Sequence, residues 1–476
     1  MATFAADKDN MSEHREERVS DAEAQKNPMA NIDPALADYV PGTDEEKALV
    51  RKIDLFLLPT IWLMYLLSYM DRTNIGNAKI AGMADDLGMD SNMYSVTLVV
   101  FFIGYVLCEV PSNMILARTR PSIFLPTIMF VWGLVTVGMG WVPTYHGLIG
   151  FRVVVGVLEA GFAPGVLLLL SSWYKKSEQS KRFAVYISAA ILSGAFGGLL
   201  AGAITEGMDG IKGLAGWRWL FIVEGAATSA WSLVAAFILL DFPANTKRLT
   251  DAERRLAILR LKSEALVHTE DQPELGHLGA LKVALTNWRT WLFVVGYMAI
   301  VGSSTLSYFY PTLVNGLGYD SHIAQYMTIP IYICAFVCTA LTGIFMDRHP
   351  SKRGFVLGAW LSIAMLCAII ICAVYNFKAR YALLVIMASA LWSSNGLALS
   401  YTSSTFSEAP AEVRAILLAF VNAMGNLAQI YGAYLFPSDD QPKYLMGFGV
   451  ISGLCFTGVA AYLSLGVLLK KWPVRK

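Results

Sequence analysis

The feature that most constrains this chain is a series of long apolar segments. Windows of about 20 apolar residues, long enough to cross a bilayer as a helix, centre near positions 66, 105, 132, 159, 194, 229, 301, 335, 365, 391, 424 and 457. Because a bilayer core offers no water to backbone N–H and C=O groups, such segments form helices. Only 15% of the residues are charged, against about 25% in soluble domains. The sequence therefore predicts an all-α integral membrane protein with twelve transmembrane helices.

Lysine and arginine set the predicted orientation. Most of the 37 basic residues fall in cytoplasmic segments if both termini are cytoplasmic, as the positive-inside rule requires. The longest hydrophilic interruption divides the spans into six plus six. We therefore expect a disordered cytoplasmic tail over 1–48, a six-helix bundle over 49–241, a cytoplasmic linker over 242–288, a second six-helix bundle over 289–470 and a short cytoplasmic tail over 471–476.

Two of these hydrophilic segments have distinct compositions. Residues 1–46 carry twelve acids and four bases with few large apolar residues, which is typical of disorder. In the linker, Thr250 and Glu253 form a capping-box pattern before a stretch of alternating apolar and basic residues. This pattern predicts an amphipathic helix along the cytoplasmic face, with the role of a linker between the bundles.

Two opposite charges lie inside the fourth span. Arg152 and Glu159 are the only charges in the 23 residues from Leu148 to Leu170. A charge at the bilayer centre costs about 2.5 to 3.5 kcal/mol, so it faces a partner, a substrate or water. Seven residues are two helical turns, so both side chains share one face. The pair therefore lines a predicted cavity or forms a structural ion pair with another span.

The first span carries a second charged group. Tyr65, Tyr69 and Arg72 are spaced i, i+4, i+7 and share a face of one long helix, beside Asp71. Arginine binds a planar carboxylate through two parallel hydrogen bonds, so we expect Arg72, flanked by the two phenols, to bind substrate, with Arg152 as the second cation that could meet it. The alternative is that Arg72 pairs with Asp71 or another acid at a helix end.

The middle of spans seven to eleven carries no charge. Its polar side chains predict neutral groups that define substrate shape, although hydrogen bonding between helices explains them equally well. We assign Tyr308, Ser393, Asn422 and Asn426 to the substrate site.

Other charges are predicted to be structural. Glu224, in the outer third of the sixth span, has no assigned role beyond pairing.

The fifth span carries a ridge of small residues, Gly194, Gly198 and Gly202, which favours close packing. A predicted cytoplasmic gate, whose salt bridges would close an outward-facing state, comprises Glu109, Arg118, Asp347, Arg348 and Arg353.

Several motifs resemble a known family. The loop after the eighth span resembles the signature loop of the Major Facilitator Superfamily, through Gly343, Asp347, Arg348 and the basic residues after them. The matching loop after the second span, residues 113–121, departs from that signature, because it has Asn113 in place of the Gly and Ala117 in place of the Asp. Five further segments resemble the anion:cation symporter family of this superfamily, in its fungal branch of allantoate, nicotinate and pantothenate permeases. They are residues 69–78, 109–113, 152–165, 172–174 and 216–225. The resemblance covers about residues 45–470.

This resemblance implies roles for the four charges of spans one and four. In related organic-anion symporters the corresponding groups bind substrate and couple protons. The resemblance places Arg72 and Arg152 on the substrate and Asp71 and Glu159 in proton coupling. A buried acid beside a base suits a proton carrier, because its ionisation depends on which anion or cation is nearby.

We therefore expect a secondary active transporter that carries a small organic anion with protons by alternating access. Nicotinate, allantoate and pantothenate are examples of the carboxylate or vitamin-like substrate. No P-loop occurs, and the six histidines fall in tails or loops, so neither ATP-driven transport nor a metal or other cofactor is expected, and the chain is not an enzyme. The expected partners are the anion, protons and the lipid bilayer, without nucleic acid.

Some alternatives stay open at this level. The protein is expected to work as a monomer in the plasma membrane, with a vacuolar or endosomal membrane as the alternative. Because a fold does not determine direction, efflux of an organic acid or secondary metabolite is a second hypothesis. A non-transporting nutrient receptor is a third, although only seven residues follow Leu469, which leaves no long signalling tail.

Overall fold

The computed structural model describes residues 39–269, 277–406, 409 and 411–472. Within these ranges it has 11 apolar helical segments long enough to cross a membrane and one shorter apolar helix, Ile416–Gly432. The prediction of an all-α, twelve-helix membrane protein is confirmed. The short helix is the eleventh span, where Asn422, Asn426 and Gln429 interrupt the apolar sequence. The predicted tail as far as residue 38 lies outside the described residues.

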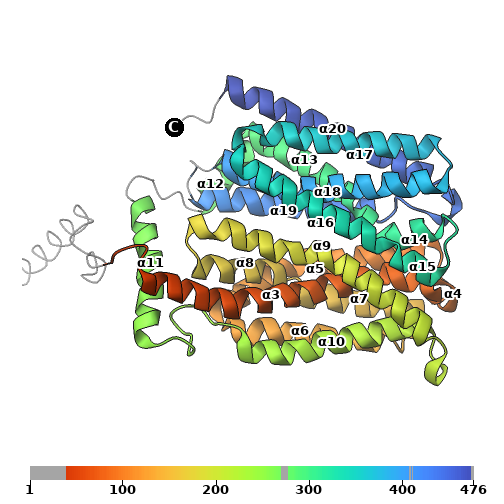
Figure 1. Cartoon of the computed structure of the whole chain (residues 1–476), viewed down its shortest axis with the longest axis horizontal. Coiled ribbons are helices and arrows are strands. Elements are labelled where there is room, and N and C mark those ends of the chain that lie inside the picture. The colour runs from red at the N-terminus through yellow and green to blue at the C-terminus, as the bar shows by residue number, and fades with distance from the viewer. Residues whose placement is uncertain (1–38, 270–276, 407–408, 410, 473–476) are drawn as a thin grey trace, which may run out of the picture.

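The first six spans form one bundle, in the lower half of Figure 1. The first span is continuous across three elements, as expected from the absence of a helix breaker before Gly82, where φ is +100°. Its elements are α3 (Asp44–Ala78), a π-helical turn (Lys79–Met83) and α4 (Ala84–Asp86). The others are α5 (Ser91–Arg118), α6 (Pro121–Met139), α7 (Tyr145–Glu159) with α8 (Phe162–Trp173), α9 (Lys176–Gly207) and α10 (Gly216–Ile238).

The last six spans form the second bundle, in the upper half of Figure 1. Its seventh and eighth spans are each made of consecutive shorter helices. The elements are α13 (Trp288–Ser304) with a 3-10 turn (Thr305–Phe309) and α14 (Tyr310–Asn315), α15 (Ser321–Tyr326) with α16 (Thr328–Arg348), α17 (Arg353–Ala373), α18 (Phe377–Thr405), α19 (Ala411–Gly432) and α20 (Leu445–Lys471). A short helix α12 (His277–Thr286) precedes them.

The first helix begins at Asp44, earlier than residue 49, where the first bundle was expected to start. The Thr43 side chain accepts a hydrogen bond from the Glu46 backbone N–H at 3.2 Å, which caps the helix. Three acids in the first turn, Asp44, Glu45 and Glu46, add a favourable interaction with the helix dipole. These local interactions extend the helix into the acidic segment that composition alone assigned to the tail.

The two bundles meet closely in their outer halves. Ser95 donates to the Ala433 carbonyl at 2.7 Å, and Ser321 donates to the Ile80 carbonyl at 2.7 Å. The glycine ridge of α9 faces the eighth span, because added Cβ atoms would meet Tyr332 at Gly194, Thr328 at Gly198 and Tyr326 at Gly202. The ridge therefore allows α9 to approach α15 and α16, and the outer end of the interface is closed.

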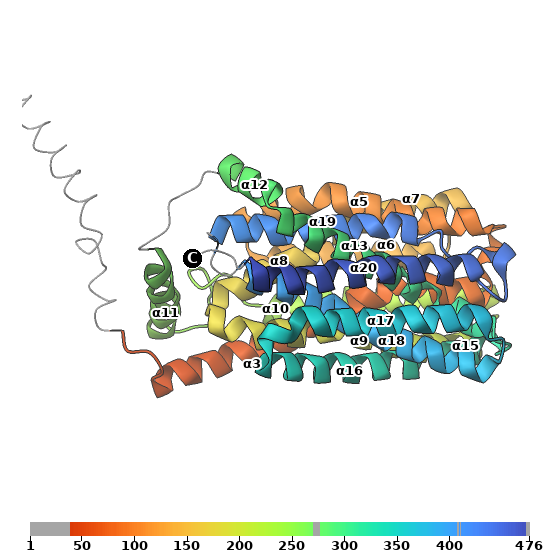
Figure 2. The same cartoon turned by 90° about the horizontal axis from the view of Figure 1, so that it is seen from above.

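The linker forms a helix, α11 (Asp251–Thr269), at the cytoplasmic end of the first bundle, where it stands across the ends of the spans in Figures 1 and 2. Its capping box is present: Thr250 accepts from the Glu253 N–H at 3.3 Å, and Glu253 accepts from the Thr250 N–H at 2.8 Å. Lys52 of α3 donates to Glu253 at 2.9 Å and lowers the pKa of that carboxyl.

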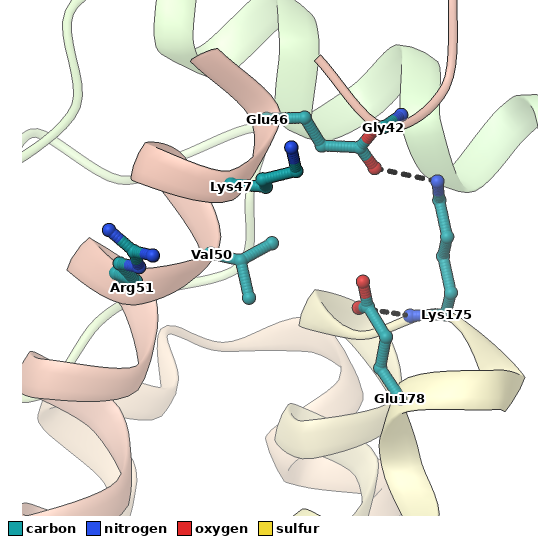
Figure 3. A pocket seen from close by; sticks show the side chains of 7 residues that line it. All are labelled: Gly42, Glu46, Lys47, Val50, Arg51, Lys175 and Glu178. Atoms are coloured by element: carbon teal, nitrogen blue, oxygen red, sulfur yellow. Dashed lines mark hydrogen bonds and ion pairs between the residues drawn. The ribbon is translucent and has the colours of Figure 1, made fainter. Parts of the chain in front are cut away.

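A buried arginine anchors this helix. Arg260 has no exposed surface, and it donates to Glu46 at 3.0 Å and to Glu178 at 2.6 Å. Lys175 also donates to Glu46, at 2.6 Å. Beside this network a cytoplasmic pocket of about 390 Å³ is lined by Gly42, Glu46, Lys47, Val50, Arg51, Lys175 and Glu178 (Figure 3). The network therefore connects α11, α3 and the start of α9.

Arg260→Met should loosen α11 from the bundle. Hydrogen bonds between charged groups are worth about 1.5 to 3 kcal/mol, so a loss of about 2 kcal/mol would raise amide exchange in α11 roughly 30-fold where local opening limits it. Hydrogen–deuterium exchange of the purified protein measures this. Arg255→Met on the exposed face of the same helix is the control. Unchanged exchange in Arg260→Met would contradict the anchoring role.

Gly198→Val should open the outer end of the interface. An added Cβ would come 2.8 Å from the Gln325 carbonyl oxygen, and overpacking costs about 1 to 3 kcal/mol. In a cysteine-free background, Ser95→Cys should then react faster with a membrane-impermeant maleimide added from outside. Gly207→Val is the control, because a Cβ there has nothing within 4 Å. Equal labelling of both variants would refute the assigned closure.

Candidate functional site

A buried ion pair joins the first and fourth spans. Arg72 Nη2 lies 2.8 Å from Glu159 Oε1, and both residues are almost completely buried. Ser68, one turn before Arg72 on α3, donates a second hydrogen bond to the same oxygen. The partner of Arg72 is therefore Glu159 and not its neighbour Asp71, so the pairing is between spans.

Aromatic rings enclose the Arg72 guanidinium. Its central carbon lies 4.8 Å from the ring centre of Tyr69, 5.2 Å from that of Phe101 and 5.1 Å from that of Tyr105. Contacts of this kind stabilise a desolvated cation. Tyr65, expected as a second flanking phenol, instead stacks on Tyr186 of α9 with ring centres 4.1 Å apart.

Arg152 is also buried but is not paired with an acid. It is 1% exposed, and its Nε donates to the Thr97 carbonyl at 3.3 Å. Phe101 lies 4.8 Å from the guanidinium, between Arg152 and Arg72. Within the described chain, Nη1 and Nη2 of Arg152 have no hydrogen-bond partner. These two nitrogens are the group that binds a carboxylate bidentately.

The second bundle places Tyr308 against this site. Phe102 of α5 and Tyr308 have ring centres 6.0 Å apart. The Tyr308 hydroxyl donates to Gln429 Oε1 at 3.4 Å, and Gln429 donates to Asn426 Oδ1 at 3.4 Å. The polar stripe of α19 thus connects to Tyr308.

The other neutral site residues lie at different distances from this cluster. Asn422 is half-buried one turn before Asn426 on the same helix. Ser393 is buried and shares a hydrogen bond of 3.4 Å with Thr339 of α16, inside the second bundle. The structure therefore packs Tyr308 against Phe102, connects Asn426 to Tyr308 through Gln429, and gives Ser393 a contact between helices.

Asp71 points away from the arginine site. It accepts hydrogen bonds at Oδ2 from Trp132 Nε1 at 3.2 Å and from Thr228 Oγ1 at 2.8 Å. Adjacent residues of an α-helix are about 100° apart around its axis, so Asp71 and Arg72 face different neighbours. The acid–base pair of the first span is therefore divided between two environments.

The five predicted gate residues lie at or near the cytoplasmic end. Arg118, Asp347 and Arg348 are exposed, and no ion pair in the described chain joins any two of the five. Arg353 donates to the Ser400 carbonyl at 3.3 Å. Glu109 is half-buried. Their gating role stays a prediction for another conformation, because here the outer end is closed.

Sequence reasoning missed several residues that complete the site. Ser68 had a detectable signal, because it is four residues before Arg72 and so on the same helix face. Phe101 and Tyr105 have the same spacing on α5. Their contact with Arg72 depends on how α5 packs against α3, which no local pattern reveals.

Comparison with known proteins agrees with this architecture. The family model of the Major Facilitator Superfamily matches residues 61–433. The chain is similar to the MFS transporter prlL of a fungal species, strain NRRL 50135, with 34% identity over 98% of this chain and 95% of that protein. It is 33% identical to the MFS-type transporter cnsO of Penicillium expansum, over 87% of this chain and 81% of that protein.

Two further comparisons are informative. A putative tartrate transporter of Agrobacterium vitis is 30% identical over 92% of this chain and 94% of that protein. Among solved structures, a bacterial homologue of the human lysosomal transporter Spinster, inward-facing and unoccupied, superposes with a TM-score of 0.67. That match covers 87% of this chain and 97% of the other at 16% identity, so it concerns the fold.

The Arg72–Glu159 pair should behave as one unit in a double-mutant cycle. Breaking a buried pair leaves an uncompensated charge and costs about 3 to 5 kcal/mol. We expect Arg72→Gln and Glu159→Gln each to lower the apparent Tm in detergent, and the double variant to lower it less than their sum. Strict additivity of the two shifts would show that the residues are not coupled.

Proposed function

Because the chain belongs to the Major Facilitator Superfamily, a family of membrane transporters and not of enzymes, we propose that it carries a small organic anion by proton-coupled symport. The substrate would be a carboxylate or vitamin-like anion such as nicotinate, allantoate or pantothenate. This assigns the chain to the anion:cation symporter branch. The plasma membrane is the proposed location, because uptake there uses the membrane potential.

The two terminal nitrogens of Arg152, which have no hydrogen-bond partner among the described residues, carry this proposal. Buried donors without acceptors are unfavourable, and a carboxylate would satisfy Nη1 and Nη2 with two parallel hydrogen bonds. The aromatic ring of Phe101 lies beside it, which suits a planar or partly apolar anion. The similarity to a putative tartrate transporter supports a carboxylate, since tartrate carries two.

Glu159 would couple the proton to this anion. In the structure its Oε1 is held by Arg72 and Ser68, while Oε2 has no partner in the described residues. Protonation of Glu159 would weaken its pairing with Arg72 and make that guanidinium available to the substrate. One proton would thus change the partner of one arginine. Inward movement of each net positive charge gains about 2.3 kcal/mol per 100 mV.

Uptake by a permease-deficient yeast tests this proposal. With labelled nicotinate, pantothenate and tartrate, we expect at least one substrate to accumulate and a protonophore to abolish accumulation. Arg152→Gln should reduce uptake about 10- to 150-fold, the equivalent of 1.5 to 3 kcal/mol for hydrogen bonds to a charged group. Arg255→Gln on the linker helix should keep wild-type uptake and serves as the matched control.

Two results would contradict the assignments separately. Full uptake by Arg152→Gln would remove Arg152 from the substrate site. Glu159→Gln should still exchange substrate across the membrane but lose proton-driven accumulation, since glutamine keeps the size and loses the ionisation. Undiminished protonophore-sensitive accumulation by Glu159→Gln would overturn the coupling role.

A further inference from the structure

Lys79, a base at the outer side of the first span, has no role in the site described above. It follows Arg72 by seven residues, so the two side chains share a face of one helix, with Lys79 about 10 Å nearer the outside. The helix changes from α to π geometry at Lys79, where the turn Lys79–Met83 begins. Short π-helical turns inside long helices are frequent at functional sites.

A stripe of aromatic residues on α5 faces Lys79 and both arginines. Tyr94, Phe101 and Tyr105 are spaced i, i+7, i+11 and so share one face of that helix. A cation of the first bundle contacts each ring. The distances from cation to ring centre are 4.2 Å for Lys79 and Tyr94, 4.8 Å for Arg152 and Phe101, and 5.1 Å for Arg72 and Tyr105. Because α5 runs inward, Lys79 is the outermost of the three cations along it.

Arg152 reaches the same part of α5 as Lys79. Its Nε donates to the Thr97 carbonyl at 3.3 Å, and Thr97 Oγ1 donates to the Tyr94 carbonyl at 2.6 Å. One turn of helix, about 5 Å of rise, thus separates the carbonyl that binds Arg152 from the residue whose ring contacts Lys79. The next cation that an anion would meet after Lys79 is therefore Arg152, whose Nη1 and Nη2 have no partner among the described residues.

The acids between α3 and α5 do not bind Lys79. Asp85 is exposed, Asp86 accepts from Trp217 at 2.7 Å, and Asp90 caps the start of α5. Among the residues that the structure describes, Lys79 forms neither an ion pair nor a hydrogen bond, and its ammonium faces aromatic rings. No contacting acid of the described chain therefore neutralises its charge.

The second bundle covers Lys79 in this conformation. The ring of Phe309, in the 3-10 turn of the seventh span, lies 5.7 Å from the ammonium and 5.8 Å from the ring of Tyr94. The Tyr94 hydroxyl donates to the Tyr308 carbonyl at 3.3 Å, and a Cβ on Gly76 would lie 2.6 Å from the same oxygen. This turn therefore packs on both α3 and α5, and separation of the bundles on the outer side would remove it from Lys79.

We propose that Lys79 is an outer binding site for the transported anion: when the outer side opens, its ammonium binds a carboxylate, which then moves along the aromatic stripe to Arg152. This deepens the proposed function and rests on it for the direction of transport. In the closed conformation, the rings of Tyr94 and Phe309 take the place of the anion beside the ammonium.

A lysine suits an entry position. Its ammonium is a compact charge with three rotatable donors on a flexible stem, whereas the planar fork of arginine binds a carboxylate in one orientation. Lys79 can therefore bind an anion that arrives in any orientation, and Arg152 can align it afterwards. The transfer exchanges hydrogen bonds between two cations and breaks no covalent bond.

The kinetics of carboxylate uptake test this role of Lys79. With labelled tartrate, nicotinate and pantothenate in the permease-deficient yeast, Lys79→Gln should raise the KM of the transported anion about 10-fold, the loss of one hydrogen bond to a charged group. The maximal rate per transporter should stay near that of wild type, because a contact made on entry contributes to capture and not to later steps. Lys79→Arg should keep the wild-type KM.

Lys212→Gln, which removes an exposed base from an outer loop of the same bundle, should also keep the wild-type KM and is the matched control. A wild-type KM in Lys79→Gln would overturn the proposal.

Chemical restoration of the charge separates binding from packing. In a cysteine-free background, Lys79→Cys should have the raised KM, and this variant replaces Lys79→Gln if that one does not fold. Reaction with 2-aminoethyl methanethiosulfonate adds an ammonium and should restore the low KM, whereas the 2-sulfonatoethyl reagent adds an anion and should not. Equal KM values after the two reactions would show that the charge of Lys79 does not bind the substrate.

A measurement without substrate distinguishes failure of this inference from failure of the symport. In a cysteine-free background, Ser95→Cys, beside Tyr94, should react from outside with sulfonate and trimethylammonium methanethiosulfonates through the same opening, so the ratio of the two rates reports the local charge. A unit charge about 8 Å from the thiol changes this ratio about five-fold in water. Lys79→Gln should therefore lower the ratio of anionic to cationic reaction about five-fold.

An unchanged ratio would overturn the role of Lys79 even if the protein carries carboxylates. If wild type shows no protonophore-sensitive uptake, the proposed symport fails, while the ratio still decides whether Lys79 attracts anions at the outer entrance.

Discussion

The ion pair between Arg72 and Glu159 connects the parts of this molecule that matter for its function. It holds α3 against the end of α7, where the fourth span changes from α7 to α8 at Ala160 and Gly161. Its surroundings are almost dry, so neither charge is stable there without the other. In the proposed function, protonation of Glu159 or an anion bound to Arg72 would change how these two spans pack and so couple binding to movement.

The groups that surround α3 differ on its two sides. On one side, aromatic rings lie against two guanidiniums, and in the described chain Arg72 is the one of the two with an acid partner. On the other side, Asp71 accepts hydrogen bonds from Trp132 of α6 and Thr228 of α10. One helix therefore presents a paired cation on one side and a hydrogen-bonded carboxylate on the other. The division follows from the 100° between consecutive residues.

The conformation described here is closed on the outer side. Glycines of α9 let it approach the eighth span, and hydrogen bonds such as Ser95 to Ala433 join the bundles. At the other end the predicted gate residues form no ion pairs with one another in the described chain. The α11 network joins elements of the first bundle, through Arg260, Glu46 and Glu178.

The sequence by itself determined the membrane character, the helix number and the presence of charges that need partners. Apolar length and the cost of burying charge are local properties, so they can be read without a structure. The tertiary structure alone decided which residues these charged and aromatic side chains contact. Arg152 and Glu159 share a helix, yet Glu159 binds Arg72, Tyr65 stacks on Tyr186, and Asp71 binds Trp132 and Thr228, because those contacts depend on the rotation and approach of separate helices.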